Sequence, residues 1–270
     1  MNTNSNLYTI LYTSIIVILV AAILAFASMA LKSKQDANVK AETISQMLTA
    51  AKLFEKEDLA KLGNDQVLAE YSKNIKEAYT IDGNGKKVAD LKTDVNSIEL
   101  IDNLKAQNDL LKKNKVDNYT LPVYVFNKDG QDVTVVPAYG AGLWGPVWGY
   151  LAFAPDMKTI VGAYFDHDSE TPGLGAKIKD DPSFRAEFEG KVADFDTDAV
   201  FSVVKGGTDS ANGVDAITGA TMTSKGLGNA ISAWLNAYKP FFKGAAASQP
   251  VQEELPAQTD SAAVAVPVTE

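Results

Sequence analysis

The sequence predicts an α+β fold: an antiparallel sheet core with flanking helices, preceded by one N-terminal transmembrane helix. Three observations support this prediction. No charged side chain occurs in residues 1–31, strand-like segments follow one another directly between residues 121 and 165, and apolar residues recur at helical spacing between 227 and 238. Strands in immediate succession favour antiparallel pairing, with helices set beside the sheet.

The first 31 residues are the candidate anchor. From Leu7 to Leu31 the chain is apolar apart from scattered Tyr, Thr and Ser, and a helix of that length crosses a bilayer core of ~30 Å. A cleaved signal peptide is the alternative, because residues 27–30, Ala-Ser-Met-Ala, offer small residues near the end of the stretch. We favour a retained single-span anchor, since no basic residue precedes the apolar stretch and the stretch is longer than a usual signal-peptide core.

The charges beside the anchor bear on its orientation. The nearest basic residues, Lys32, Lys34 and Lys40, all lie on its C-terminal side. Read literally, the positive-inside rule would therefore keep the large domain in the cytoplasm.

Composition limits the function. Hydrophobic residues make up 46% of the chain, which is enough for one globular core after the anchor, and the net charge of −9 gives no basic footprint for nucleic acid. The chain has no cysteine, which excludes a disulfide, a thiolate-held iron–sulfur cluster and a thiolate-bound haem. His167 is its one histidine, so a zinc or copper site is poorly supported. Any redox chemistry therefore requires an organic cofactor.

Residues 32–118 are predicted to form a helical, membrane-proximal segment. Apolar residues recur at helical spacing from Val39 to Phe54 and again from Leu100 to Leu111, and residues 81–85 are typical of a turn. The charged runs in this segment are typical of solvated faces, and the segment offers no catalytic constellation.

Residues 119–243 are predicted to form the functional domain. A hairpin is expected from 121–126 and 132–137, joined by a turn at 127–130, and a second strand pair from 147–153 and 159–165. The acidic tail, residues 244–270, is expected to be disordered.

Two glycine-rich stretches, residues 139–145 and 167–175, frame the second strand pair. Glycine lets the backbone approach a ligand closely, while Trp144 and Leu174 offer flat apolar contact to an aromatic ring system. The alternative is two tight turns with a core tryptophan. His167 is expected to hydrogen-bond the second stretch in preference to relaying a proton, because one-electron transfer needs no acid–base residue.

A hydroxyl-rich stretch, residues 215–224, directly precedes the clearest amphipathic helix. A helix start offers unpaired N–H groups and a positive dipole end, and both suit a phosphate. The alternative is that Thr218 or Thr221 is an ordinary N-cap. Asp215 is expected to brace the loop through backbone N–H groups. Gly226 and Gly228 in the following helix suggest that something approaches that face closely.

The run from Thr218 to Thr223 resembles the flavinylation motif of the FMN-binding domain family, and both glycine-rich stretches resemble blocks of the same family in the same order. The resemblance covers about 121–240. It implies that Thr223 carries FMN through a phosphoester bond. It also implies further FMN-binding residues: Gly142, Leu143, Trp144, Glu170, Thr171, Gly173, Leu174, Thr218, Gly219, Ala220 and Thr221. Independently of the resemblance, Lys205 ends a predicted strand ahead of the hydroxyl-rich stretch and is a candidate partner for the flavin phosphate or the anionic edge of the ring; the alternative is a surface lysine at a strand end.

The resemblance further implies an electron-carrying subunit of a bacterial inner-membrane complex that oxidises NADH, reduces quinone and moves Na⁺. The partners it implies are other subunits of the complex, the membrane, and a flavin transferase that attaches the FMN outside the cytoplasm, on the periplasmic side. NADH is expected to bind another subunit, because no nicotinamide fingerprint occurs here. A sister complex that reduces ferredoxin is the near alternative, although the long segment at 32–118 favours the first. An anchored binding module without flavin is the alternative from a different class.

Overall fold

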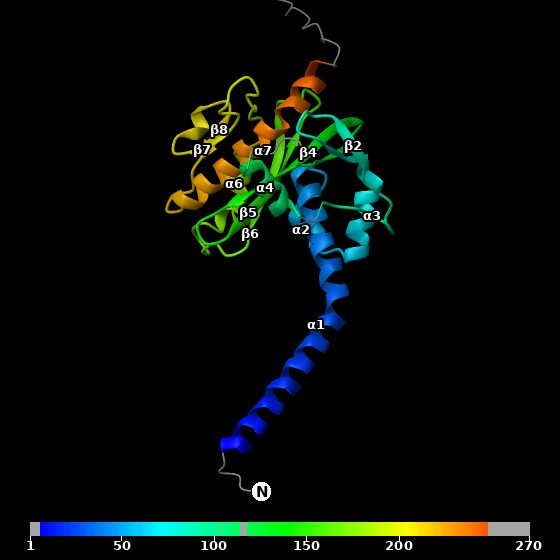
Figure 1. Ribbon diagram of the computed structural model, residues 1–270. Coiled ribbons are helices and arrows are strands. Elements are labelled where there is room, and N and C mark those ends of the chain that lie inside the picture. The colour runs from blue at the N-terminus through cyan, green and yellow to red at the C-terminus, as the bar shows by residue number, and fades with distance from the viewer. Residues whose placement is uncertain (1–5, 102, 114–117, 248–270) are drawn as a thin grey trace, which may run out of the picture.

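The computed structural model describes residues 6–101, 103–113 and 118–247. Its centre is a six-stranded sheet in the order β2-β1-β3-β4-β5-β6, in which every neighbouring pair is antiparallel (Figure 1). The antiparallel sheet core of the predicted α+β fold is confirmed. The strands are β1 (Ile75–Ile81), β2 (Lys87–Asp90), β3 (Leu121–Lys128), β4 (Gln131–Ala141), β5 (Pro146–Phe153) and β6 (Ile160–His167).

Both predicted strand pairs are present. The β3–β4 turn contains Asp129 at φ 52° and Gly130 at φ 84°, a left-handed geometry that glycine adopts without strain. The β5–β6 pair forms around residues 154–156, as expected. A third hairpin joins β4 to β5 through the first glycine-rich stretch, where Gly142 N donates to Gly145 O at 2.7 Å.

The prediction of a helical segment at 32–118 is wrong for residues 75–81 and 87–90, which form β1 and β2. In β1 the charged residues Lys76 and Glu77 interrupt the alternation of apolar and polar residues that marks a strand, and all four residues of β2 are exposed. Pairing of β1 with β3 makes this segment part of the main sheet. The helices of the segment are α2 (Lys56–Leu59), α3 (Asn64–Asn74) and α4 (Leu104–Lys112).

Helix α1 (Asn6–Ala50) is long and apolar enough to cross a membrane, by length and composition. Its most apolar window is 0% buried, and the helix projects from the globular body (Figure 1). The predicted anchor and the amphipathic helix predicted after it are therefore one continuous helix. Only its last part, from Ala41 to Ala50, packs on the sheet.

The sheet is covered on both faces. The end of α1 and helix α3 pack on one face, where Met47 and Tyr71 join Phe126 in one apolar cluster. Helix α7 (Thr221–Ala247) packs on the other, where Trp234 and Phe242 belong to a second cluster. Because both faces are buried, β4 has six consecutive buried residues where a half-exposed strand would alternate.

The remaining elements connect β6 to α7. They are α5 (Lys177–Asp180), α6 (Pro182–Ala186), η1 (Gly207–Asp209) and a parallel pair, β7 (Ser202–Val204) and β8 (Gly213–Asp215). Helix α7 runs to Ala247, so residues 244–247 of the expected disordered tail are helical. The rest of that expected tail, residues 248–270, lies outside the described residues.

Candidate functional site

The candidate site is centred on the first turn of α7. Gly219 precedes it at φ 81°, a conformation that a residue with a Cβ rarely adopts, and Ile217 N donates to Ser224 Oγ at 3.0 Å. This bond ties the turn back to the helix that it opens. The hydroxyl-rich stretch is therefore a rigid corner between β8 and α7.

The four hydroxyl residues of this corner divide into two pairs. Thr223 and Ser224 are buried, with 1% and 0% of their surface exposed, and each hydroxyl has a hydrogen-bond partner. Thr218 and Thr221 are exposed, and within the described residues neither side chain makes a hydrogen bond. Neither therefore acts as the N-cap that the sequence left open. The hydroxyls that are free to react are those of Thr218 and Thr221.

A buried carboxylate joins the corner to the first glycine-rich stretch. Thr223 Oγ1 donates to Glu170 Oε2 at 2.5 Å, while Glu170 Oε1 accepts from the backbone N–H groups of Leu143 at 2.7 Å and Trp144 at 3.0 Å. Glu170 itself is 5% exposed. We name Glu170 and Thr223 the Glu170–Thr223 latch.

Two glycines make room for this latch. A Cβ on Gly142 would overlap Glu170 Oε1, and a Cβ on Gly175 would overlap Glu170 Oε2 and lie 2.6 Å from Thr223 Oγ1. Gly142 and Gly175 are therefore required here by a carboxylate of the chain itself. Sequence reasoning had assigned the close approach to a ligand.

Glu170 is held in its ionised form. Burial alone raises the pKa of its carboxyl, but the hydrogen bonds from Thr223, Trp144 and Leu143 outweigh burial and hold the pKa below its ordinary value. The latch is therefore a charge-assisted hydrogen bond.

His167 and Asp215 both accept backbone hydrogen bonds, but Asp215 braces a different loop from the hydroxyl-rich stretch that the sequence predicted. The backbone N–H of Glu170 donates to His167 Nδ1 at 3.2 Å, which is the structural role preferred for this histidine. The backbone N–H of Thr208 donates to Asp215 Oδ1 at 3.2 Å, and this bond lowers the pKa of Asp215. Asp215 thereby braces the loop at η1.

A cavity of about 710 Å³ lies between β7 and the first turns of α7. We name it the β7–α7 cavity. Its lining includes the two free hydroxyls, Thr218 and Thr221, together with Gly219 and the exposed cations Lys205 and Lys225. The volume is ordinary for a cofactor site. Hydroxyls and lysines converging beside a helix N-terminus suit a phosphate group.

Exposed apolar side chains lie in the two glycine-rich stretches and around the corner between β8 and α7. Trp144 is 68% exposed, Leu143 49% and Leu174 43%, and Leu174 Cδ2 lies 3.1 Å from the position of a Cβ on Gly219. Met222 in the first turn and Val204 in the cavity wall are also exposed. Trp144 is therefore not the core tryptophan of the alternative interpretation.

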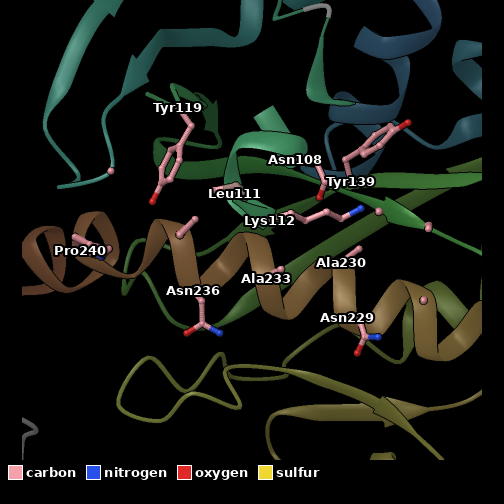
Figure 2. Close-up of a pocket in the computed structure, with 15 residues that line it drawn as sticks. Asn108, Leu111, Lys112, Tyr119, Tyr139, Asn229, Ala230, Ala233, Asn236 and Pro240 are labelled. Carbon is pink, nitrogen blue, oxygen red and sulfur yellow. The ribbon is translucent and has the colours of Figure 1, made fainter. Parts of the chain in front are cut away.

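A second cavity, of about 620 Å³, lies between α4 and α7 (Figure 2). Asn108 and Lys112 face it from α4, and small residues such as Ala230 and Ala233 face it from α7. None of the predicted flavin residues lines this cavity. The β7–α7 cavity is therefore the better candidate for a phosphate-bearing cofactor.

The structure thus divides the predicted site residues into two groups. Leu143, Trp144 and Glu170 meet at the latch, whereas Thr218, Thr221 and Lys205 meet in the cavity. The sequence predicted that Glu170 contacts the flavin ring, and it did not indicate Lys225 as a binding residue. The helix glycines do mark close approach, but by the chain itself: a Cβ on Gly226 would overlap Ala141 O.

The comparisons with known proteins show the family to which the chain belongs. The family model described as FMN-binding domain matches residues 142–236, from the first glycine-rich stretch through most of α7. The NqrC component of the Na(+)-translocating NADH-quinone reductase of Pasteurella multocida is 33% identical over 182 residues, which cover 64% of this chain and 69% of that protein. The chain belongs to the NqrC family.

Other members of the NqrC family support the assignment. The protein of Pseudomonas aeruginosa is 36% identical over 143 residues, which cover 50% of this chain and 54% of that relative, so this match spans about half of its length. The crystal structure of the NqrC protein from Parabacteroides distasonis superposes with a TM-score of 0.63 at 34% identity, covering 78% of this chain and 96% of that one. Membership in the NqrC family favours the sodium-translocating complex over its ferredoxin-linked sister.

Proposed function

We propose that this chain is a membrane-anchored, electron-carrying subunit of a Na⁺-translocating NADH:quinone oxidoreductase, and that it holds FMN covalently at the start of α7. The observation that carries the proposal is the free, exposed hydroxyl of Thr221. It lines the β7–α7 cavity beside two lysines, within the residues that match the FMN-binding domain. FMN, when bound, supplies reversible one- and two-electron redox chemistry.

Two threonines of α7 compete as the acceptor of the phosphoester bond, while Thr218 lies in the loop ahead of the helix. The motif resemblance assigned it to Thr223, but the geometry favours Thr221. Thr223 is 1% exposed, and its hydroxyl is already held by Glu170. An anionic phosphoester on Thr223 Oγ1 would also lie against the ionised Glu170 carboxylate, and like charges at contact repel. On Thr221 the same anion faces Lys205 and Lys225.

The attachment balances as a phosphoryl-group transfer. Thr221 Oγ1 attacks the phosphorus of an FMN phosphate activated as the phosphoric anhydride of a flavin dinucleotide. The Oγ1–P bond forms and the anhydride P–O bond breaks. The leaving nucleotide takes the electron pair, and the hydroxyl proton passes to solvent. A separate flavin transferase performs this step, since no catalytic group of this chain hydrogen-bonds the Thr221 hydroxyl within the part of the chain that is described.

Each group of residues then has a defined task. Lys205 and Lys225 balance the phosphate charge, and the exposed side chains of Leu143, Trp144 and Leu174 offer apolar contact to the ring system. The latch keeps the glycine-rich stretch against the flavin-bearing turn. NADH binds another subunit of the complex, and electrons reach this chain from a neighbouring subunit.

The proposal places α1 across the bacterial inner membrane and the globular domain on the periplasmic side, following the family resemblance. The opposing signal consists of only three lysines, Lys32, Lys34 and Lys40, and Lys40 Nζ also has a place in the fold, donating to Ile98 O at 2.8 Å. The chain has no cysteine, so single cysteines report topology cleanly. With the outer membrane permeabilised, a membrane-impermeant maleimide labels Val88→Cys and spares Asn4→Cys; the opposite pattern would refute the periplasmic orientation.

The central test is covalent labelling. The full chain is expressed with its flavin transferase, separated on a denaturing gel under ultraviolet light, and weighed as an intact protein. We expect a fluorescent band and a mass gain of FMN less one water in the wild type and in Thr221→Ser, and neither in Thr221→Ala. A wild type that stays dark, while the transferase modifies a control protein, would replace this proposal with the flavin-free binding module.

A further inference from the structure

The Glu170–Thr223 latch lies directly behind the proposed acceptor. Thr221 and Thr223 are two residues apart on one helical turn, so their side chains point about 200° apart around the axis of α7. Fixing one side chain inward therefore fixes the other outward. The hydrogen bond of 2.5 Å between Thr223 Oγ1 and Glu170 Oε2 is the contact that fixes the inward side.

We propose that Glu170 and Thr223 are positioning residues for flavin attachment, because their latch holds the first turn of α7 with the Thr221 hydroxyl facing the β7–α7 cavity. This inference rests on the proposed function. It assigns Thr223 a role different from that of flavin carrier. Neither residue touches the transferred phosphoryl group; both act through the orientation of Thr221.

The latch is rigid on the Glu170 side. Glu170 Oε1 accepts hydrogen bonds from the backbone N–H groups of Leu143 and Trp144. The backbone N–H of Glu170 donates to His167 Nδ1. Both carboxylate oxygens and the backbone N–H of Glu170 are therefore engaged. The carboxylate is a fixed point to which α7 is fastened.

This fixed point is connected to the other side of the sheet. His167 N donates to Asp166 Oδ1 at 2.8 Å, and Asp166 Oδ2 accepts from Gln46 Nε2 of α1 and from Lys179 Nζ, both at 2.8 Å. A continuous series of hydrogen bonds thus leads from α1 through Asp166, His167 and Glu170 to the first turn of α7. The proposed acceptor is therefore oriented against the body of the protein as well as by its own loop.

The experiment measures kcat/KM of the flavin transferase for full-length acceptor variants, from the increase in intact mass with time. Thr223→Val removes the hydroxyl at nearly constant volume, and Glu170→Ala removes the carboxylate. We expect kcat/KM to fall about tenfold or more in each, as for the loss of a hydrogen bond to a charged group. Thr223→Ser keeps the hydroxyl and should stay within about twofold of wild type, on the same reasoning.

Tyr238→Phe is the matched control for stability. It removes another buried hydrogen bond of α7, from Tyr238 Oη to Pro122 O at 2.6 Å. This bond lies away from the first turn of α7. Thermal unfolding is recorded for all variants, and Tyr238→Phe should be labelled at the wild-type rate despite a lower melting temperature. An equal slowing in Tyr238→Phe would reduce the latch to a contribution to stability and overturn the positioning role.

The remaining outcomes separate the two proposals. If the wild type is labelled and Thr223→Val and Glu170→Ala are labelled equally fast, the positioning role is refuted while the flavin function stands. If Thr221→Ala is labelled and both Thr223→Val and Thr223→Ala are not, Thr223 is the carrier and the positioning role is again refuted. If the wild type is never labelled, the proposed function itself fails.

Discussion

Gln46 of α1 donates a hydrogen bond of 2.8 Å from Nε2 to Asp166 Oδ2 of β6, 120 positions later in the chain. Both side chains are buried, at 3% and 4% exposed, and Asp166 also pairs with Lys179. This contact fastens the helix that carries the candidate membrane span to β6, the strand that leads into the second glycine-rich stretch. It makes α1 part of the globular domain as well as an anchor.

Asp166→Ala should therefore destabilise the protein by about 3 kcal/mol, because it leaves the buried Gln46 amide and the half-buried Lys179 ammonium without their shared acceptor. Denaturant unfolding of the full chain in detergent measures the change. The exposed neighbour Asp168 is the control, and Asp168→Ala should stay within about 0.5 kcal/mol. Equal losses in the two variants would show that the buried contact has no special weight.

Gly175→Ala tests the space around the latch. The added Cβ would overlap Glu170 Oε2 and lie 2.6 Å from Thr223 Oγ1, so the two side chains must separate. We expect a loss of about 1–3 kcal/mol in unfolding free energy, as for other overpacked sites, together with slower flavin attachment. Gly145→Ala is the control, because its Cβ would come no nearer than 3.4 Å to other atoms. Wild-type stability in Gly175→Ala would argue against a tightly packed latch.

Local patterns predicted much of the fold. The β3–β4 hairpin was predictable because apolar residues flank a turn with Gly130 at its end, and α7 because Leu227, Ile231 and Trp234 recur at helical spacing. Strand β2 was missed because all four of its residues are exposed. Strand β1 was missed because Lys76 and Glu77 break its alternation and its partner β3 lies far along the chain. Such strands are defined by tertiary pairing, which a local pattern does not contain.

The site was also predictable only where a local pattern marks it. The glycine-rich stretches and hydroxyls were found, but the contact between Glu170 and Thr223 joins residues 53 positions apart, and no local pattern indicates it. The choice between threonines did have a signal. Thr223 precedes the buried Leu227 by four residues, so helical periodicity places it on the buried face and Thr221 off it.

Tyr71→Phe should leave the protein as stable as wild type or stabilise it by about 1 kcal/mol. The ring is fully buried beside Phe126, and within the described part of the chain the Tyr71 hydroxyl has no hydrogen-bond partner. Removing this hydroxyl therefore removes the free-energy cost of burying a polar group that has no partner. Tyr238→Phe, whose hydroxyl is hydrogen-bonded, should change stability in the opposite direction. A clear loss in Tyr71→Phe would reveal a bound water or another partner at this hydroxyl.

The pH dependence of stability should reveal the contribution of the ionised Glu170 carboxylate to the folded state. Its pKa is lower in the folded protein than in the unfolded chain, so its ionised form stabilises the fold above the unfolded pKa of about 4.3. That contribution is lost as the pH falls through the lower, folded pKa. Glu170→Gln removes the titration, so the variant should be less stable than wild type at pH 7 and the difference should shrink with acid. Melting temperatures between pH 7 and pH 3 measure it, with Glu57→Gln as an exposed control. A difference that stays constant across this range would mean that the carboxylate is not ionised in the latch.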